Sequence, residues 1–156
     1  NVRTTAYQIT SFLEGVVKRG TGKKLKELKL NLAGKTGTTN ENTDAWFVGF
    51  TSDLVIGVYV GMDNPKPLGK FETGSKAALP IFKEFVEKAI KKSDARPFKV
   101  PKKMTLMVID PLTGEKAKFN SKNTIIEAYK SSNVLNGKVL YSDNNRLDAN
   151  NILEFY

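Results

Sequence analysis

A lysine and three threonines stand close together in the stretch NLAGKTGTTN, residues 31–40. Glycine, lysine and threonine at this spacing serve two kinds of chemistry. In a P-loop, backbone amides wrap the phosphates of a nucleotide and the lysine reaches the terminal ones. In a serine acyl-transfer site, a Lys-Thr-Gly strand lines the cleft beside the nucleophile and an anionic end of the substrate. The residues on either side decide between the two.

The P-loop interpretation fails on its flanks. It requires the pattern G-x-x-x-x-G-K-[ST], with a helix starting directly afterwards. Alignment on Gly34, Lys35 and Thr36 places Lys29 where the first glycine is needed. The chain then runs into DAWFVGF, whose aromatic and β-branched residues are typical of a strand. The sequence therefore disfavours nucleotide binding.

The acyl-transfer interpretation gives each residue of the stretch a role. On an edge strand, the ammonium of Lys35 would point into a cleft and the hydroxyl of Thr36 would donate to a substrate carboxylate. Gly37 lacks a Cβ, so an extended peptide could lie against the strand. The backbone amide of Thr38 could be one donor of an oxyanion hole. From these four residues alone, Lys35 could equally be a charge that blunts an edge strand.

Composition removes several classes of mechanism. The 156-residue chain has no cysteine and no histidine, which excludes disulfides, thiol catalysis and Ser-His-Asp triads within it. We predict no metal site and no cofactor. The net charge of +9 comes mostly from lysine, with only four arginines, so nucleic-acid binding is not expected. A solvated basic surface, or attraction to an anionic membrane or wall polymer, explains the charge.

Two amphipathic helices are predicted. Residues 4–18 have helical apolar spacing, and Thr4 or Thr5 can cap their start. Residues 75–91 form the second helix, which tolerates Pro80 in its first turn. The lysine-rich segment 23–29 is predicted to be an exposed connection. The buried stripes are expected to comprise Ile9, Phe12, Leu13, Val16 and Val17 in the first helix and Ala78, Leu79, Phe82, Phe85, Val86, Ala89 and Ile90 in the second.

Two strands are predicted at 44–50 and 54–62, joined by a short turn, with the Lys-Thr-Gly stretch as a third strand nearer the edge. Neither of the two alternates apolar with polar residues, so helices are expected to cover both faces of the sheet. Trp46 and Phe47 are expected to be core residues.

A boundary is predicted at KKSDARP, which divides residues 1–95 from a tail at 96–156. Within the tail, KKMTLMVIDPLTGEKAKF is predicted to be a hairpin that turns at 110–114. The remainder is rich in Asn and Ser and is expected to be partly strand and partly irregular.

Longer stretches of the chain resemble one family. GVVKRGTG, LAGKTGTTNENTDAWFVGFTSDLVIGVYVGMDNPKPLG and ETGSKAALPIFKEF are similar to the C-terminal part of the transpeptidase domain of bifunctional, class A penicillin-binding proteins. The resemblance covers about residues 1–90, and FKVPKKMTLMVIDPLTGEKA matches the tail that often follows. It implies an α/β fold of the α+β type. An antiparallel sheet flanked by helices would form part of a serine β-lactamase/transpeptidase-like fold, with a small β-rich tail.

The resemblance also implies a reaction, in which a serine attacks the D-Ala-D-Ala end of a peptidoglycan stem peptide and the acyl group passes to a neighbouring amine. β-Lactams would trap the serine. Carried over, Lys35 would tune the nucleophile and the substrate carboxylate. Thr36 and Thr38 would hold that carboxylate, Gly37 would admit the peptide, and the Thr38 amide would complete the oxyanion hole. The parent protein would be anchored in a bacterial inner membrane, with this domain facing the periplasm or outside.

The chain departs from the family in lacking the nucleophile. No Ser-x-x-Lys occurs in the 156 residues, and Ser131-Ser132-Asn133 follows the Lys-Thr-Gly stretch where the family places its Ser-x-Asn before it. We expect the missing N-terminal part of the same domain to be a partner, and the chain alone to be inactive. Two alternatives stay open: a non-catalytic module that binds peptidoglycan peptides, and a fragment of a serine β-lactamase or D,D-carboxypeptidase.

In the family, two further strands pair beside the strand at 54–62. Without them that strand is an exposed apolar edge, which favours association. We expect a second copy of the chain, or the tail strand at 104–110, to cover it.

Overall fold

The computed structural model describes residues 2–91, 93–135 and 138–139. The chain divides into two compact units. One is Phe12–Phe98, and the other comprises the residues up to Ser11 together with those from Lys99 on. The predicted boundary between 1–95 and 96–156 stays a prediction. The part of the predicted tail at 140–156 lies outside the described residues.

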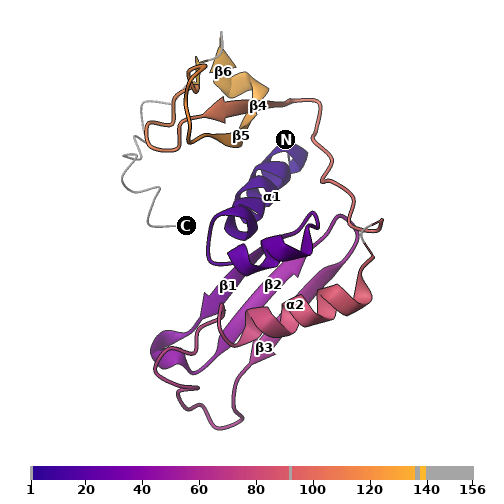
Figure 1. Ribbon diagram of the computed structural model, residues 1–156, viewed down its shortest axis with the longest axis vertical. Helices are drawn as coiled ribbons and strands as arrows, with labels where there is room; N and C mark the ends of the chain where they lie inside the picture. The colour runs from indigo at the N-terminus through magenta and orange to yellow at the C-terminus, as the bar shows by residue number, and fades with distance from the viewer. Residues whose placement is uncertain (1, 92, 136–137, 140–156) are drawn as a thin grey trace. The chain divides into compact units, whose positions relative to one another are not determined.

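The chain forms a series of helices and strands, of which Figure 1 labels α1, α2 and β1 to β6. They are α1 (Val2–Lys18), η1 (Lys23–Leu28), β1 (Ala33–Thr38), η2 (Asn40–Asn42), β2 (Ala45–Phe50), β3 (Val55–Val60), α2 (Ala78–Ala89), β4 (Met104–Ile109), β5 (Ile125–Lys130), η3 (Ser131–Asn133), β6 (Val134–Leu135) and β7 (Lys138–Val139), where η marks a 3-10 helix.

The first sheet confirms the predicted strands. Its order is β1-β2-β3, and both pairs are antiparallel. A tight turn joins β2 to β3, in which the Thr51 N–H donates to the carbonyl of Leu54 at 2.9 Å. The Thr51 hydroxyl accepts from the N–H groups of Asp53 and Leu54 at 3.2 and 3.1 Å. The Lys-Thr-Gly strand lies at the edge of the sheet, as expected.

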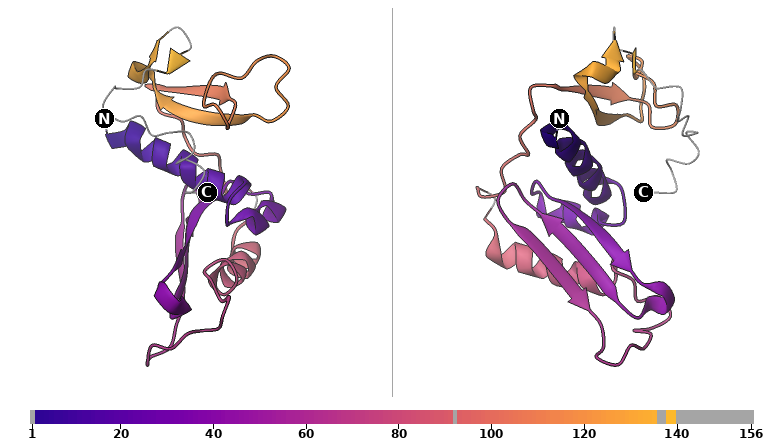
Figure 2. Two further views of the ribbon diagram at one scale, coloured as in Figure 1. Left: turned by 90° about the vertical axis from the view of Figure 1, so that its left-hand side faces the viewer. Right: turned by 180° about the vertical axis from the view of Figure 1, so that it is seen from behind.

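One face of this sheet carries the core. Every second residue of β2, namely Ala45, Phe47 and Gly49, is buried on the face that α2 covers. The left view of Figure 2 shows the sheet edge-on with α2 on one side of it. Phe47 and Phe82 meet edge to face with ring centroids 4.6 Å apart, and both are fully buried. A Cβ on Gly49 would lie 2.6 Å from the Phe82 ring, so only glycine leaves room for that ring.

The opposite face is open in the part of the chain that the structure describes. Trp46 and Val48 are 42% exposed and Tyr59 is 50% exposed. The expectation that helices cover both faces is therefore wrong for the described residues, and Trp46 is not a core residue, whereas Phe47 is. The prediction failed for a physical reason. Apolar residues on both faces of a strand indicate that both faces favour burial, but they do not show which helix, strand or partner buries them.

The first helix and the segment after it differ in part from the prediction. α1 begins at Val2, so Thr4 lies inside the helix, where it is buried, and does not cap it. Val16 and Val17 are buried, but Ile9 and Phe12 are 52% and 40% exposed.

The segment 23–29 is largely exposed, as predicted, but it is helical and has one buried residue. Lys23–Leu28 forms η1, and Leu25 is 1% exposed because it packs into the core beneath the sheet.

α2 confirms the second predicted helix with shorter bounds, and Pro80 is its third residue. Ala78, Leu79, Phe82 and Val86 are buried as expected. Phe85 and Ala89 are exposed, contrary to the prediction, because they lie beside the stripe that faces the sheet.

The tail pairs differently from the prediction. The turn at 110–114 forms, with the Gly114 N–H donating to Asp110 O at 2.8 Å and Gly114 at φ +69°. The returning chain pairs only briefly, through a bridge between Ile109 and Lys116. Beside that bridge, the N–H groups of Asp110 and Ala117 donate to the carbonyls of Glu115 and Val108 at 2.9 Å each. β4 pairs along its length with β5 instead. The return segment EKAKF is rich in lysine, whereas β5 (IIEAYK) has the β-branched and aromatic residues that favour strand pairing.

That pairing also bears on the edge of β3. β4 forms a separate two-stranded sheet with β5, and the idea that Met104–Asp110 covers β3 stays a prediction. Self-association through 54–62 stays a prediction.

Loss of the Phe82 ring tests the assignment of the core. We expect Phe82→Ala to lower the free energy of unfolding by about 3–5 kcal/mol, because it removes a fully buried ring and leaves a cavity against Phe47. Phe85→Ala, on the exposed side of the same helix, is the matched control and should cost less than about 1 kcal/mol. Urea unfolding of the two variants gives the comparison. Equal losses would contradict the assigned face of α2.

Candidate active-site strand

The backbone of β1 presents N–H and C=O groups along its outer edge that pair with no other strand of the described residues. The Thr39 N–H donates to Asp44 O at 3.1 Å, which continues the β1–β2 ladder. Because inward and outward backbone groups alternate along an antiparallel strand, Lys35, Gly37 and Thr39 pair toward β2. The N–H and C=O groups of Thr36 and Thr38 therefore face away from β2. An extended peptide could pair with this edge as an added strand.

Lys35 and Gly37 lie on the open face of the sheet. In the β1–β2 register, Lys35 stands opposite Val48 and Gly37 opposite Trp46. Lys35 is exposed, and its ammonium donates to the carbonyl oxygen of Thr36 at 3.1 Å. A Cβ on Gly37 would lie 3.2 Å from the Trp46 Cβ, so glycine keeps the surface low at this point.

The two threonine side chains lie on the opposite face. The hydroxyls of Thr36 and Thr21 are hydrogen-bonded at 3.0 Å. The hydroxyl of Thr38 accepts a hydrogen bond from the Gly74 N–H at 3.0 Å. The four residues singled out in the sequence thus share one strand, but their side chains divide between its two faces. Only the outer edge gives access to both.

The loop before α2 holds β1 from the covered face, a contact that the sequence did not reveal. A Cβ on Gly74 would overlap the Trp46 carbonyl oxygen and lie 2.5 Å from that of Gly37. Only glycine lets the loop approach β1 and β2 so closely. The glycine is visible in the sequence, but its contact spans 36 residues and has no local signal.

A second cluster missed in the sequence stands where β1 ends. The carboxylate of Asp44 accepts hydrogen bonds from Tyr59 at 2.7 Å and from Thr39 and Thr43 at 3.2 Å each. These bonds, led by that from Tyr59, hold the pKa of the Asp44 carboxyl below its usual range. The same hydrogen bond to Asp44 raises the pKa of Tyr59. The Tyr59 ring also packs on Trp46, with centroids 4.7 Å apart.

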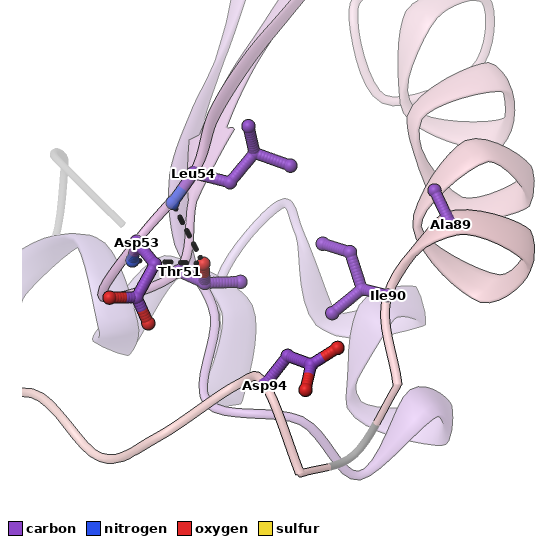
Figure 3. A pocket seen from close by; sticks show the side chains of 6 residues that line it. All are labelled: Thr51, Asp53, Leu54, Ala89, Ile90 and Asp94. Carbon is purple, nitrogen blue, oxygen red and sulfur yellow. Dashed lines mark hydrogen bonds between the residues drawn. The ribbon is translucent and has the colours of Figure 1, made fainter.

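A small hollow lies at the other end of the sheet (Figure 3). Its volume is about 140 Å³, and its lining comes from the β2–β3 turn and the end of α2. The turn that supplies Asp53 follows Phe50, which pairs with Ala33 at the start of β1, so the hollow is remote from Thr38. Asp53 accepts hydrogen bonds from Ser52 and Arg96. This hollow therefore contributes nothing to the Lys35–Thr38 strand.

Two other motifs considered in the sequence do not have the structures that their functions need. Gly34-Lys35-Thr36 lies inside β1, which continues to Thr38, so the helix that a P-loop needs does not follow. Ser131-Ser132-Asn133 forms η3 in the other unit of the chain.

Gly74 and Gly57 offer a matched pair of substitutions. We expect Gly74→Ala to lower the free energy of unfolding by about 1–3 kcal/mol, because the new methyl group meets two backbone oxygens that cannot move without shifting β1 or β2. Gly57 has nothing within 4 Å of an added Cβ, so Gly57→Ala should leave stability within about 0.5 kcal/mol of wild type. Thermal or urea unfolding measures both. If Gly74→Ala behaved like Gly57→Ala, the close approach of the loop would be refuted.

Within the described part of the chain, none of the helices has the length and apolar character needed to cross a bilayer. Residues 3–87 match the family described as the penicillin binding protein transpeptidase domain. Penicillin-binding protein 1A of Rickettsia conorii is 51% identical over 128 residues, which are 82% of this chain and 16% of that protein. That of Pseudomonas aeruginosa is 42% identical over 128 residues, 81% of this chain and 16% of that protein.

A solved structure gives the same result for the fold. The crystal structure of penicillin-binding protein 1A from Haemophilus influenzae matches with a TM-score of 0.70 at 30% identity, covering 81% of this chain and 20% of that one. The predicted fold class and the resemblance to part of a class A penicillin-binding protein are confirmed. The chain spans about 16% of the length of the curated relatives it matches. It belongs to the penicillin-binding protein transpeptidase family.

Proposed function

We propose that this chain is part of a peptidoglycan D,D-transpeptidase that works through an acyl-serine intermediate and is a target of β-lactams. One observation carries the proposal: in a member of this family, the Lys-Thr-Gly strand lies at a sheet edge that no strand of the described residues covers. Lys35 is exposed on the open face there, and the Thr38 amide faces outward from the sheet. A strand so placed can bind an extended peptide and also supply groups to the reaction.

The reaction begins at the penultimate D-Ala of the stem peptide. A serine oxygen attacks its carbonyl carbon, and the oxyanion that forms accepts a hydrogen bond from the Thr38 N–H. The C–N bond to the last D-Ala then breaks, the leaving nitrogen takes a proton, and an acyl-serine remains. An amine on a neighbouring stem peptide attacks that ester, which forms the cross-link and releases the serine. A β-lactam follows the first steps and stays attached.

Each residue of the strand has a role in this scheme. Lys35 supplies positive charge beside the serine and the substrate carboxylate, within reach of a site on the open face. Gly37 leaves space for the peptide above the strand. The Thr38 hydroxyl accepts from Gly74 and keeps its own proton, which it can donate to the carboxylate around the strand edge. Thr36 can do the same only if its hydrogen bond with Thr21 rearranges.

The nucleophile must come from elsewhere, because the 156 residues contain no Ser-x-x-Lys. We assign it to a preceding part of the same domain. The exposed apolar residues of the open face support this, since Trp46, Val48 and Tyr59 would be covered by such a partner. The parent protein would act in the bacterial cell envelope, anchored in the inner membrane and facing the periplasm or outside.

A fluorescent penicillin tests the proposal directly. The 156-residue chain should acquire no covalent label, because it lacks the serine, whereas a longer protein that also contains the preceding part of the domain should be labelled. In that longer protein, Lys35→Gln should slow labelling by at least about 100-fold. Lys26→Gln, at an exposed lysine on η1, is the control and should label at the wild-type rate.

Three outcomes would contradict the proposal in different ways. Labelling of the short chain would show a nucleophile within it. Rapid turnover of the penicillin by the longer protein would indicate a β-lactamase. Binding of a D-Ala-D-Ala peptide without any acylation of the longer protein would indicate a non-catalytic peptide-binding module.

A further inference from the structure

The chain makes an unusually constrained turn directly after Thr38. β1 and β2 are joined through η2, in which Glu41 and Asn42 have φ angles of +60° and +55°. Left-handed backbone at a residue other than glycine is uncommon and costs free energy, so surrounding contacts must hold it. The turn is not held by packing, because none of the residues of η2 is buried. Polar contacts must therefore stabilise the left-handed backbone of this turn.

Asp44 makes those contacts from both its backbone and its side chain. Its N–H donates to the Thr39 hydroxyl at 2.8 Å, and its carbonyl accepts from the Thr39 N–H at 3.1 Å. The carboxylate adds the hydrogen bonds from Tyr59 and Thr43. The loop is tied further to the segment before α2, since the Asn42 carbonyl accepts from the Leu68 N–H at 2.9 Å. One residue thus closes the end of β1 onto β2.

Tyr59 links Asp44 to β3. It lies on β3, opposite Trp46 on β2, which in turn stands opposite Gly37. Its hydroxyl donates to Asp44 Oδ1 at 2.7 Å, the short distance expected for a hydroxyl bound to a carboxylate. A Cβ on Gly61 would overlap the Tyr59 hydroxyl, so a glycine leaves room for the pair. Asp44 is therefore linked to all three strands at the end where Thr38 lies.

We propose that Asp44, held by Tyr59, is a positioning residue that fixes the direction of the Thr38 amide by anchoring Thr39 to β2. This rests on the proposed function for the role of that amide. The Thr38 N–H lies between two residues that pair with β2, Gly37 on one side and Thr39 on the other. Gly37 is the most flexible kind of residue, so the anchor at Thr39 limits how far the peptide plane before Thr38 can rotate. An oxyanion donor that rotates loses its contact with the transition state.

The first test uses the 156-residue chain, where no catalysis is needed. Hydrogen exchange followed by NMR should show the Thr39 amide of Asp44→Asn exchanging at least about tenfold faster than in wild type, because a charge-assisted hydrogen bond that supports it is lost. Asp53→Asn is the matched control, since Asp53 also follows a strand end and accepts two side-chain hydrogen bonds. It should leave Thr39 unchanged. An unchanged Thr39 amide in Asp44→Asn would overturn the proposal.

The second test measures acylation in the longer protein, with the rate constant of acylation separated from the dissociation constant of the β-lactam. Asp44→Asn and Tyr59→Phe should each lower the rate constant by roughly 10- to 100-fold and change the dissociation constant less than about threefold. Asp53→Asn should change neither. A purely structural role would lower the Tm and the fraction of active protein and leave the rate constant of the remaining protein unchanged; that result would overturn the proposal.

The two tests separate this inference from the proposed function. If wild-type longer protein were not acylated at all, the proposed function would fail, and the exchange rates in the 156-residue chain would still decide whether Asp44 anchors Thr39. If wild type were acylated and all three variants matched it, the proposed function would stand and the positioning role would fall.

Discussion

The register of β1 on β2 is the constraint on which the rest of the site depends. Gly37 stands opposite Trp46 and Thr38 opposite Ala45, and side chains alternate between faces along a strand. A slip of one residue would move Lys35 from the open face to the side packed against α2. It would also exchange the outward amides of Thr36 and Thr38 for those of their neighbours. The Lys35 ammonium, the backbone of Gly37 and the outward Thr38 amide are assigned to one edge because of this pairing.

Two contacts keep that register, and both act from the covered face of the sheet. Below the sheet, the ring of Phe82 occupies the space left by Gly49, which fixes α2 along β2. On the same face, Gly74 lies against the backbone of Gly37 and Trp46, and its N–H donates to the Thr38 hydroxyl. None of these groups carries chemistry of its own. Their common effect is to hold an exposed edge strand, which would otherwise be free to shift, in one position.

Much of the sheet could be predicted because its signals are local. Aromatic and β-branched runs predicted β2 and β3, and polarity placed the Lys-Thr-Gly stretch at the edge. Prediction failed where the partner of an element decides its environment. The apolar residues of the open face were predicted to be covered, and the burial of Leu25 was missed because lysines surround it in the sequence. β4 pairs with β5 and not along its length with the nearer return segment. Composition gives the preference of a segment for burial or pairing but not its partner.

The candidate site follows the same division. Lys35, Gly37 and Thr38 could be found because their motif is contiguous, and the alternation of a strand then separates the lysine from the threonine hydroxyls. The contacts of Asp44 with Tyr59 and of Gly74 with Thr38 span 15 and 36 residues, and neither has a periodic signature. Only the folded chain brings these residues to the motif, so sequence reasoning could not assign them.

The central claim is that the outward edge of β1 holds the reacting group, and a crystal structure of the acylated longer protein measures this directly. The account predicts that the carbonyl oxygen of the β-lactam-derived acyl group lies about 2.7–3.1 Å from the Thr38 nitrogen, with the Lys35 ammonium on the same side of the strand. An acyl group bound away from this edge, or a Thr38 amide paired with another part of the protein, would contradict it.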